Sequence, residues 1–180
     1  MGLSAIPTDH PLNKGMVGMH GNVGPNMMTN QCDVLIAIGM RFSDRVTGNL
    51  KTYAKQAKVI HFDIDPCEIG KNVKPTVGVL GDVKKTIKAV YEKMNNNVHY
   101  EWINSFATYE NREQDKVVKK EINPIDGRLH MGEVVRKVSE ASNKCAVLVT
   151  DVGQNQIMAT RYFQFSRSRS VITSGGLGTM

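Results

Sequence analysis

Short apolar runs alternate with polar, helix-prone stretches along the first half of the chain. Three such runs, rich in Val, Ile and Leu, cover residues 33–39, 58–65 and 76–81. Continuous apolar runs of this length, bounded by glycine or proline, are typical of parallel strands that are covered on both faces. Strands that alternate with helices in this way predict an α/β fold with a parallel sheet.

Helical spacing is clearest after the third run. Asp82 is placed to cap a helix, because its carboxylate can accept hydrogen bonds from the free backbone N–H groups of a first turn. The apolar residues that follow share one helical face: Ile87, Val90, Tyr91 and Met94. Asparagine tolerates the left-handed conformation that ends many helices, so residues 95–97 predict the end of this one.

The second half of the chain opens with a polar helical stretch over residues 100–121, which the turn-forming residues 123–127 interrupt. An amphipathic helix from about residue 131, a buried strand at 146–150 and a helix that opens near Gly153 are expected to follow.

We therefore predict three segments. Residues 1–98 form a Rossmann-like nucleotide-binding domain, residues 99–128 a helical linker, and residues 129–180 the first βα portion of a second α/β domain. A Gly- and Pro-rich loop over residues 2–21 has no strand before it, and a Gly-rich turn ends the chain. Since both ends would then fall inside domains, we expect the chain to be a fragment of a longer enzyme.

Composition excludes several classes of protein. No apolar run approaches the roughly 18 residues that span a bilayer, and nothing at the start is typical of a signal peptide, so we expect a cytoplasmic protein without membrane contact. The net charge of +6 is dispersed among acidic residues. The local basic patch, Arg161 with residues 166–170, is interpreted as solvated, and no nucleic-acid partner is predicted. Three separated cysteines favour buried, reduced thiols.

Candidate ligand-binding residues follow each predicted strand and also lie in a glycine-containing stretch before a predicted helix. They occur in the stretches 18–21, 39–48, 63–65 and 81–83, which supply glycines, two arginines and several acids. Open α/β sheets bind ligands at the carboxyl ends of their strands, where glycine turns admit a diphosphate and arginine pairs with it. Together they suggest an adenine dinucleotide. Each residue alone has an ordinary structural alternative, such as a turn glycine, a surface ion pair or a packed His20, and no GxGxxG motif is present.

Five motifs carry a family resemblance. Residues 15–21 (GMVGMHG), 39–48 (GMRFSDRVTG), 61–72, 150–154 (TDVGQ) and 174–180 (SGGLGTM) resemble, in order and spacing, the catalytic large subunit of acetolactate synthase. This family uses thiamine diphosphate. The resemblance covers nearly the whole chain.

The resemblance implies a subunit of three domains, of which this chain holds most of the FAD-binding central domain and the start of the thiamine-diphosphate domain. It implies that the following residues line the FAD: Gly18, Met19, His20, Gly39, Arg41, Ser43, Arg45, Val46, Asp63, Ile64, Gly81, Asp82 and Val83. It also implies that Gln154, Asn155, Gly178 and Met180 contact the thiamine diphosphate.

The activity implied by the resemblance is the condensation of two 2-oxo acids with loss of CO₂, in branched-chain amino-acid synthesis. The implied assembly is a homodimer or homotetramer with a regulatory small subunit. The activating Glu and the Mg²⁺ ligands of the family have no counterpart among these residues, so no catalytic or metal-binding residue is assigned and the chain alone is expected to be inactive. FAD binding by this fragment is possible but is expected to be weak or absent, because the resemblance places parts of the pocket in other segments of the parent enzyme.

Two residues depart from the family's pattern, Asn155 in place of His and Ser43 in place of Asp. Asparagine can donate a hydrogen bond but cannot titrate near neutral pH. Two alternatives stay open: another thiamine-diphosphate enzyme, of the pyruvate oxidase or glyoxylate carboligase type, and a nucleotide-binding module without catalytic activity.

Overall fold

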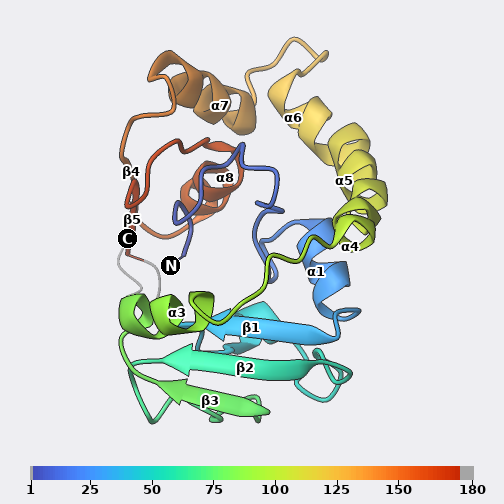
Figure 1. Cartoon of the computed structure of the whole chain (residues 1–180). Coiled ribbons are helices and arrows are strands. Elements are labelled where there is room, and N and C mark those ends of the chain that lie inside the picture. Colours follow the sequence, from blue (N-terminus) through green and yellow to red (C-terminus); the bar gives the residue numbers. More distant parts are fainter. Residues whose placement is uncertain (1, 175–180) are drawn as a thin grey trace. The chain divides into compact units, whose positions relative to one another are not determined.

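The computed structural model describes residues 2–174, which form two compact units (Figure 1). The central unit consists of residues 17–19 and 25–104, and the terminal unit of residues 2–16, 20–24 and 105–174. Helix α1 (Val23–Thr29) begins in the terminal unit and continues in the central unit. The domain boundaries expected after residues 98 and 128 stay a prediction.

The central unit is built on a parallel sheet whose strand order is β1–β2–β3. Its strands are β1 (Val34–Ile38), β2 (Lys58–Asp63) and β3 (Val77–Leu80), each within a run predicted from the sequence. Ile38 pairs with Phe62, and Asp63 pairs with Leu80, so the three strands end at the same edge. The predicted α/β class with a Rossmann-like parallel sheet is confirmed.

The core of the central unit lies on one face of this sheet. It contains Ala37, Phe42, Tyr53, Ala54 and Val59, all buried. The ring of Phe42 meets Tyr53 edge to face, with centroids 6.2 Å apart. Side chains at alternate positions of a strand share a face, which is why Ala37 of β1 and Val59 of β2 pack into this one cluster.

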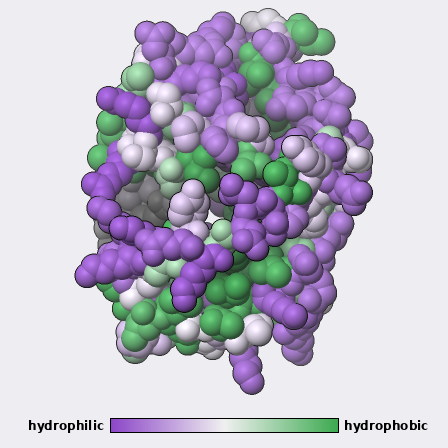
Figure 2. All heavy atoms as spheres, in the orientation of Figure 1, coloured by the Kyte–Doolittle hydropathy of each residue, from purple (hydrophilic) through white to green (hydrophobic). Residues whose placement is uncertain are grey.

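On the other face of the sheet the β1 positions are exposed in the described residues, contrary to the expectation that β1 is covered on both faces, whereas Phe62 of β2 is buried there. Ile36 and Ile38 are 52% and 46% exposed, and Val77 of β3 is also exposed. Figure 2 shows hydrophobic side chains gathered over the part of the molecule that holds the sheet, next to the hydrophilic residues of α3. The continuous apolar run therefore predicted correctly that residues 34–38 form a strand, but it did not predict how much of that strand is buried.

Helix α3 (Val83–Tyr91) follows β3 and is capped as predicted, because the Asp82 carboxylate accepts hydrogen bonds from the backbone N–H groups of Lys84 and Lys85. The predicted end at residues 95–97 is wrong, since α3 ends at Tyr91. The amides of Lys93 and Met94 bond to carbonyls three residues earlier, and this tighter turn ends the α-helical pattern before the asparagines.

Replacing Asp82 with Ala is expected to lower the free energy of unfolding by about 0.5–2 kcal/mol, because two amides at the start of α3 lose their acceptor. Urea denaturation followed by circular dichroism measures this loss. Asp82→Asn is the matched control, since the amide oxygen can still cap. Equal losses in the two variants would show that the cap is not the cause.

The terminal unit is mainly helical. The helices are α5 (Ala107–Glu113), a π-helical turn η1 (Gln114–Val118), α6 (Lys119–Ile122), α7 (Met131–Ala141) and α8 (Gln154–Tyr162). Helix α4 (Tyr100–Ser105) precedes them along the chain. The predicted helical character of residues 100–121 and the helices at 131 and 153 are confirmed.

Two short parallel strands complete the terminal unit, β4 (Leu148–Thr150) and β5 (Val171–Thr173). Strand β4 begins two residues later than predicted, and it is not a buried strand, since Val149 is 67% exposed. Among the described residues β4 pairs with β5 alone. Apolar side chains of these strands, which the sequence predicts to be buried, therefore stay exposed to solvent.

His130 lies between two carboxylates at the start of α7. Its Nδ1 is 3.2 Å from Glu121 Oε2, and its Nε2 is 3.2 Å from Asp126 Oδ2. The hydrogen bond to Asp126, followed by that to Glu121, raises the pKa of His130 above 6.5. A backbone hydrogen bond from Arg128, followed by the one from His130, lowers the pKa of Asp126 below 3.8.

Replacing His130 with Gln is expected to remove a stabilising contribution that depends on pH. The folded chain raises the pKa of His130, so this contribution is full below pH 6.5 and disappears as the pH rises through the raised pKa. Its acidic limit lies below pH 3.8, where Asp126 takes up a proton. Urea denaturation of both chains at about pH 5.5 and about pH 9 measures the effect, and equal differences at the two pH values would contradict it.

Among residues 2–174, no helix has the length and apolar character needed to cross a membrane. The three cysteines are free, as predicted. Cys32 is buried, whereas Cys67 and Cys145 are exposed, so the expectation of three buried thiols is wrong for two of them.

Candidate functional site

The strand ends of the central unit bring several predicted residues together. Gly39 donates a backbone hydrogen bond to the carbonyl of Phe62 at 2.8 Å, and Gly81 donates one to the carbonyl of Asp63 at 2.9 Å. The glycines that follow β1 and β3 are therefore each bonded to the end of β2. Ile64, directly after Asp63, is exposed at this edge.

The loop that contains Gly18 and Met19 is bonded to helix α2 (Asp44–Thr47), because Met19 N donates to Arg45 O at 2.9 Å. Gly18 has a φ of +101°, and an added Cβ would lie 2.9 Å from Arg45 O and 3.2 Å from the Cα of Val46. Only glycine allows this close approach of two backbones. The structure thus joins two stretches that the sequence predicted as parts of one site.

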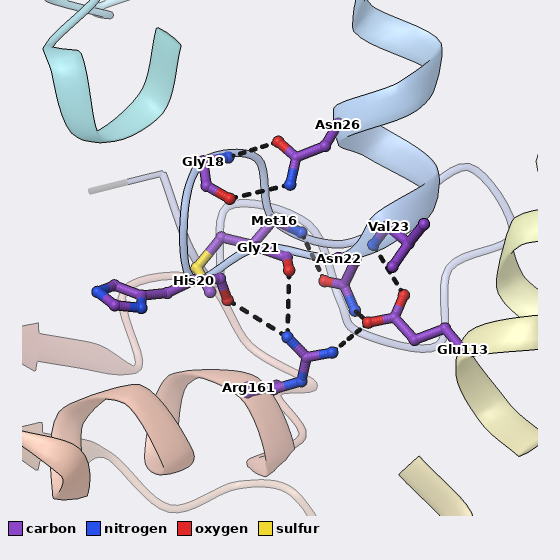
Figure 3. A network of polar contacts seen from close by, with 9 residues as sticks. All are labelled: Met16, Gly18, His20, Gly21, Asn22, Val23, Asn26, Glu113 and Arg161. Carbon is purple, nitrogen blue, oxygen red and sulfur yellow. Dashed lines mark hydrogen bonds and ion pairs between the residues drawn. The ribbon is translucent and has the colours of Figure 1, made fainter. Parts of the chain in front are cut away.

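Asn26 of α1, which was not among the predicted site residues, holds the Gly18 loop from the other side. Its Oδ1 accepts a hydrogen bond from Gly18 N at 2.8 Å, and its Nδ2 donates to Gly18 O at 2.9 Å (Figure 3). An amide side chain can satisfy both polar groups of one peptide unit in this way. The sequence feature that could have indicated this role is an asparagine in the first turns of a helix that follows a glycine loop.

The loop after β1 is anchored by a buried ring. Phe42 is 2% exposed and meets His61 of β2 edge to face, with centroids 5.1 Å apart. The carbonyl of Arg41 accepts a hydrogen bond from Asn72 Nδ2 at 3.0 Å. The side chains of Arg41 and Arg45 are exposed, and neither pairs with Asp44 or Asp63. Ser43 and Val46 of the same loop are partly buried.

The two predicted acids already have structural partners. Asp63 Oδ1 accepts a hydrogen bond from Asp65 N at 3.0 Å, and its Oδ2 lies 3.7 Å from Nε2 of the fully buried His61. Asp82 caps α3, which begins with the exposed Val83. A ribose or ribityl hydroxyl would therefore use the lone pairs that remain on these carboxylates.

The central unit offers the groups that a dinucleotide diphosphate requires. A Cβ added at Gly39 would meet no atom within 4 Å, so there is open space beside the end of β1. Two exposed guanidinium groups follow, that of Arg41 in the loop that begins there and that of Arg45 in helix α2 after it. Backbone close to open space and planar cationic donors fit a diphosphate.

The terminal unit holds the remaining predicted contacts. Gln154 and Asn155 are exposed in the first turn of α8, after Gly153, whose φ is +131°. Asn155 Nδ2 donates a hydrogen bond to Asp151 Oδ1, so this acid orients the amide. An open depression of about 480 Å³ is lined by Asn155 together with residues of α7 and β4. The predicted contacts Gly178 and Met180 lie outside the described residues.

His20, the last predicted flavin contact, belongs to the terminal unit and is exposed. Its backbone carbonyl accepts a 3.5 Å hydrogen bond from Arg161 Nη1. The interpretation of Arg161 as part of a solvated basic patch is therefore wrong. Its side chain is 17% exposed and forms an ion pair with Glu113, a residue that sequence reasoning missed.

The chain belongs to a family of cofactor-dependent enzymes. Residues 1–90, half of the chain, match the family model described as thiamine pyrophosphate enzyme, central domain. The parallel sheet and its strand-end glycines lie within this match. The chain is therefore a member of the thiamine pyrophosphate enzyme family, and its first half matches the central domain of that family.

The similar proteins are acetolactate synthases. The chain is 40% identical, over its whole length, to the probable acetolactate synthase large subunit of Methanocaldococcus jannaschii. It is 37% identical over 99% of its length to the acetolactate synthase isozyme 2 large subunit of Escherichia coli, and 35% identical over its whole length to the chloroplastic acetolactate synthase 2 of Zea mays. It spans 31%, 31% and 28% of these proteins. The resemblance seen in the motifs is confirmed.

Proposed function

We propose that this chain is part of an acetolactate synthase large subunit, in which two 2-oxo acids condense with loss of CO₂. Similarity over the whole chain supports the proposal. The observation that carries it is the hydrogen bond between Met19 and Arg45, because it joins the GMHG and RFSDRVTG motifs on which the resemblance rests.

The proposed role of the central unit is to bind FAD at its strand ends. Arg41 and Arg45 would pair with the diphosphate, and the turn at Gly39 would let the cofactor approach the backbone. Asp63 and Asp82 would accept hydrogen bonds from ribose or ribityl hydroxyls in addition to those from their own chain. His20 is also proposed to contact FAD.

The proposed role of α8 is to contact thiamine diphosphate, which when bound supplies the carbanion chemistry of the condensation. Gln154 and Asn155 are exposed amides in the first turn of this helix and can donate hydrogen bonds. Asp151 holds the Asn155 amide in one orientation. No described residue is assigned to Mg²⁺, which in this proposal is bound by other parts of the enzyme.

The proposed partners follow from the same assignment. They are small 2-oxo acids as substrates, further copies of the large subunit in a homodimer or homotetramer, and a regulatory small subunit. The relatives are named as large subunits, which supports a multisubunit enzyme.

Titration of the purified chain with FAD tests the proposed flavin site. Quenching of flavin fluorescence is expected, with affinity weakened at least about tenfold in the double variant Arg41→Gln/Arg45→Gln, because two charge-assisted contacts are lost. Lys51→Gln/Lys55→Gln is the control for net charge, since it also removes two positive charges and both lysines are exposed outside the site. Absence of quenching, or equal affinity of the double variant and the wild type, would contradict the flavin assignment.

Product analysis tests the proposed reaction. A chimera in which this chain replaces the matching third of the Escherichia coli isozyme 2 large subunit is expected to form acetolactate from pyruvate. Formation of peroxide from pyruvate would instead indicate an oxidase of the same family.

A further inference from the structure

A buried carboxylate at the end of α5 gathers three donors within the terminal unit (Figure 3). Glu113 Oε2 accepts a hydrogen bond from Val23 N at 2.9 Å, and Oε1 accepts one from Asn22 Nδ2 at 3.3 Å. Oε1 also accepts a hydrogen bond from Nη2 of Arg161, on α8. The Glu113 side chain is only 5% exposed, so these donors take the place of water.

Arg161 uses its other terminal nitrogen on the backbone of the loop before α1. Nη1 donates to Gly21 O at 3.1 Å and to His20 O at 3.5 Å. One guanidinium group therefore links a carboxylate of α5 to two carbonyls of the loop. A lysine lacks this planar fork of two terminal nitrogens, so its single ammonium group does not reproduce the geometry that spans the carboxylate and the carbonyls.

The imidazole of His20 takes no part in this network. Figure 3 shows its ring pointing away from Arg161 and Glu113, while its carbonyl faces the guanidinium group. The contact therefore fixes the backbone of the loop and not the ring. A residue held in this way can present its side chain to a ligand from a defined position.

We infer that Glu113 and Arg161 are positioning residues that hold the segment 20–23 in a fixed conformation for ligand binding at His20. Arg161 belongs to α8, the helix that begins at the predicted thiamine-diphosphate contact Gln154. The pair thus ties a predicted flavin contact to the helix that carries a predicted thiamine contact. The identity of the ligand at His20 rests on the proposed function, whereas the positioning of the segment does not.

Two measurements on the purified chain test the inference. Hydrogen exchange of the Val23 amide, followed by NMR, reports the segment directly, because this amide is bonded to Glu113. FAD titration reports the ligand site. The variants are Arg161→Gln, which removes both contacts, and Arg161→Lys, which keeps a positive charge for Glu113. Arg112→Gln is the matched control, since Arg112 is exposed on α5.

Arg161→Gln is expected to speed exchange at Val23 by at least about tenfold, because the buried Glu113 carboxylate loses its charged partner. It is also expected to weaken FAD binding by about tenfold or more. Arg161→Lys should exchange nearly as slowly as the wild type but bind FAD as weakly as Arg161→Gln, since the carbonyls of His20 and Gly21 are released. Arg112→Gln should change neither quantity.

Two outcomes would overturn the inference: unchanged exchange at Val23 in Arg161→Gln, or faster exchange with FAD affinity within about twofold of the wild type. The second would mark the ion pair as a stabilising contact alone. If the wild-type chain binds no FAD, the proposed flavin site fails, and exchange at Val23 alone then decides whether the pair positions the segment.

Discussion

Replacing Phe42 with Ala is expected to lower the free energy of unfolding by about 3–5 kcal/mol, which is the usual cost of truncating a buried aromatic ring. Phe42 is 2% exposed and contacts Tyr53 and His61 edge to face. The ring also anchors the loop between Gly39 and α2, so its loss should release Arg41 and Arg45 together. Urea denaturation measures the first effect and FAD titration the second.

Two further variants make this prediction specific. Phe42→Leu keeps most of the buried apolar volume and should cost clearly less than Phe42→Ala. Tyr91→Ala removes an exposed ring at the end of α3 and should leave stability nearly unchanged. A loss in Phe42→Ala no larger than in Tyr91→Ala would show that Phe42 is not part of a packed core.

Replacing Gly18 with Ala is expected to destabilise the chain by about 2–4 kcal/mol, because the change adds a steric clash to an unfavourable backbone conformation. The new Cβ would lie 2.9 Å from Arg45 O, and φ at this position is +101°. Relief of the clash requires the loop to move away from α2, which breaks the hydrogen bond between Met19 and Arg45. Weaker FAD binding should accompany the loss of stability, measured by thermal or urea denaturation.

Gly48→Ala separates the two causes. Gly48 has a φ of +58° and a ψ of −126°, but an added Cβ would meet no atom within 4 Å, so only the conformational cost of a sparsely populated backbone region, about 1–3 kcal/mol, applies. A loss in Gly18→Ala equal to that in Gly48→Ala would show that the loop has no close contact with α2.

The sequence predicted the elements of the central unit more accurately than their burial. The three strands and α3 lie where hydrophobic runs and the Asp82 cap place them, because these signals are local. Burial of Ile36 or Val149 depends on which other segments pack over the sheet, and an apolar run in the sequence does not show which segments those are. The end of α3 at Tyr91 was missed for a related reason, since its last turn tightens before the asparagines are reached.

The residues of the candidate site likewise fall into those that the sequence predicted and those that only the structure revealed. Glycines, arginines and acids after each strand were visible because parallel strands end at one edge, which topology alone guarantees. The roles of Asn26, Glu113 and Arg161 were not visible. Glu113 lies 48 residues from Arg161 and 90 from Val23, and no local pattern relates such positions.

The sequence by itself determined the α/β class, the order of the strands and helices, and the relationship to acetolactate synthase large subunits, because periodicity, capping and motif spacing are properties of neighbouring residues. Only the tertiary structure decided which residues hold the predicted ligand loops in place. A buried ion pair forms where distant segments exclude water together, and that exclusion exists only in the folded chain.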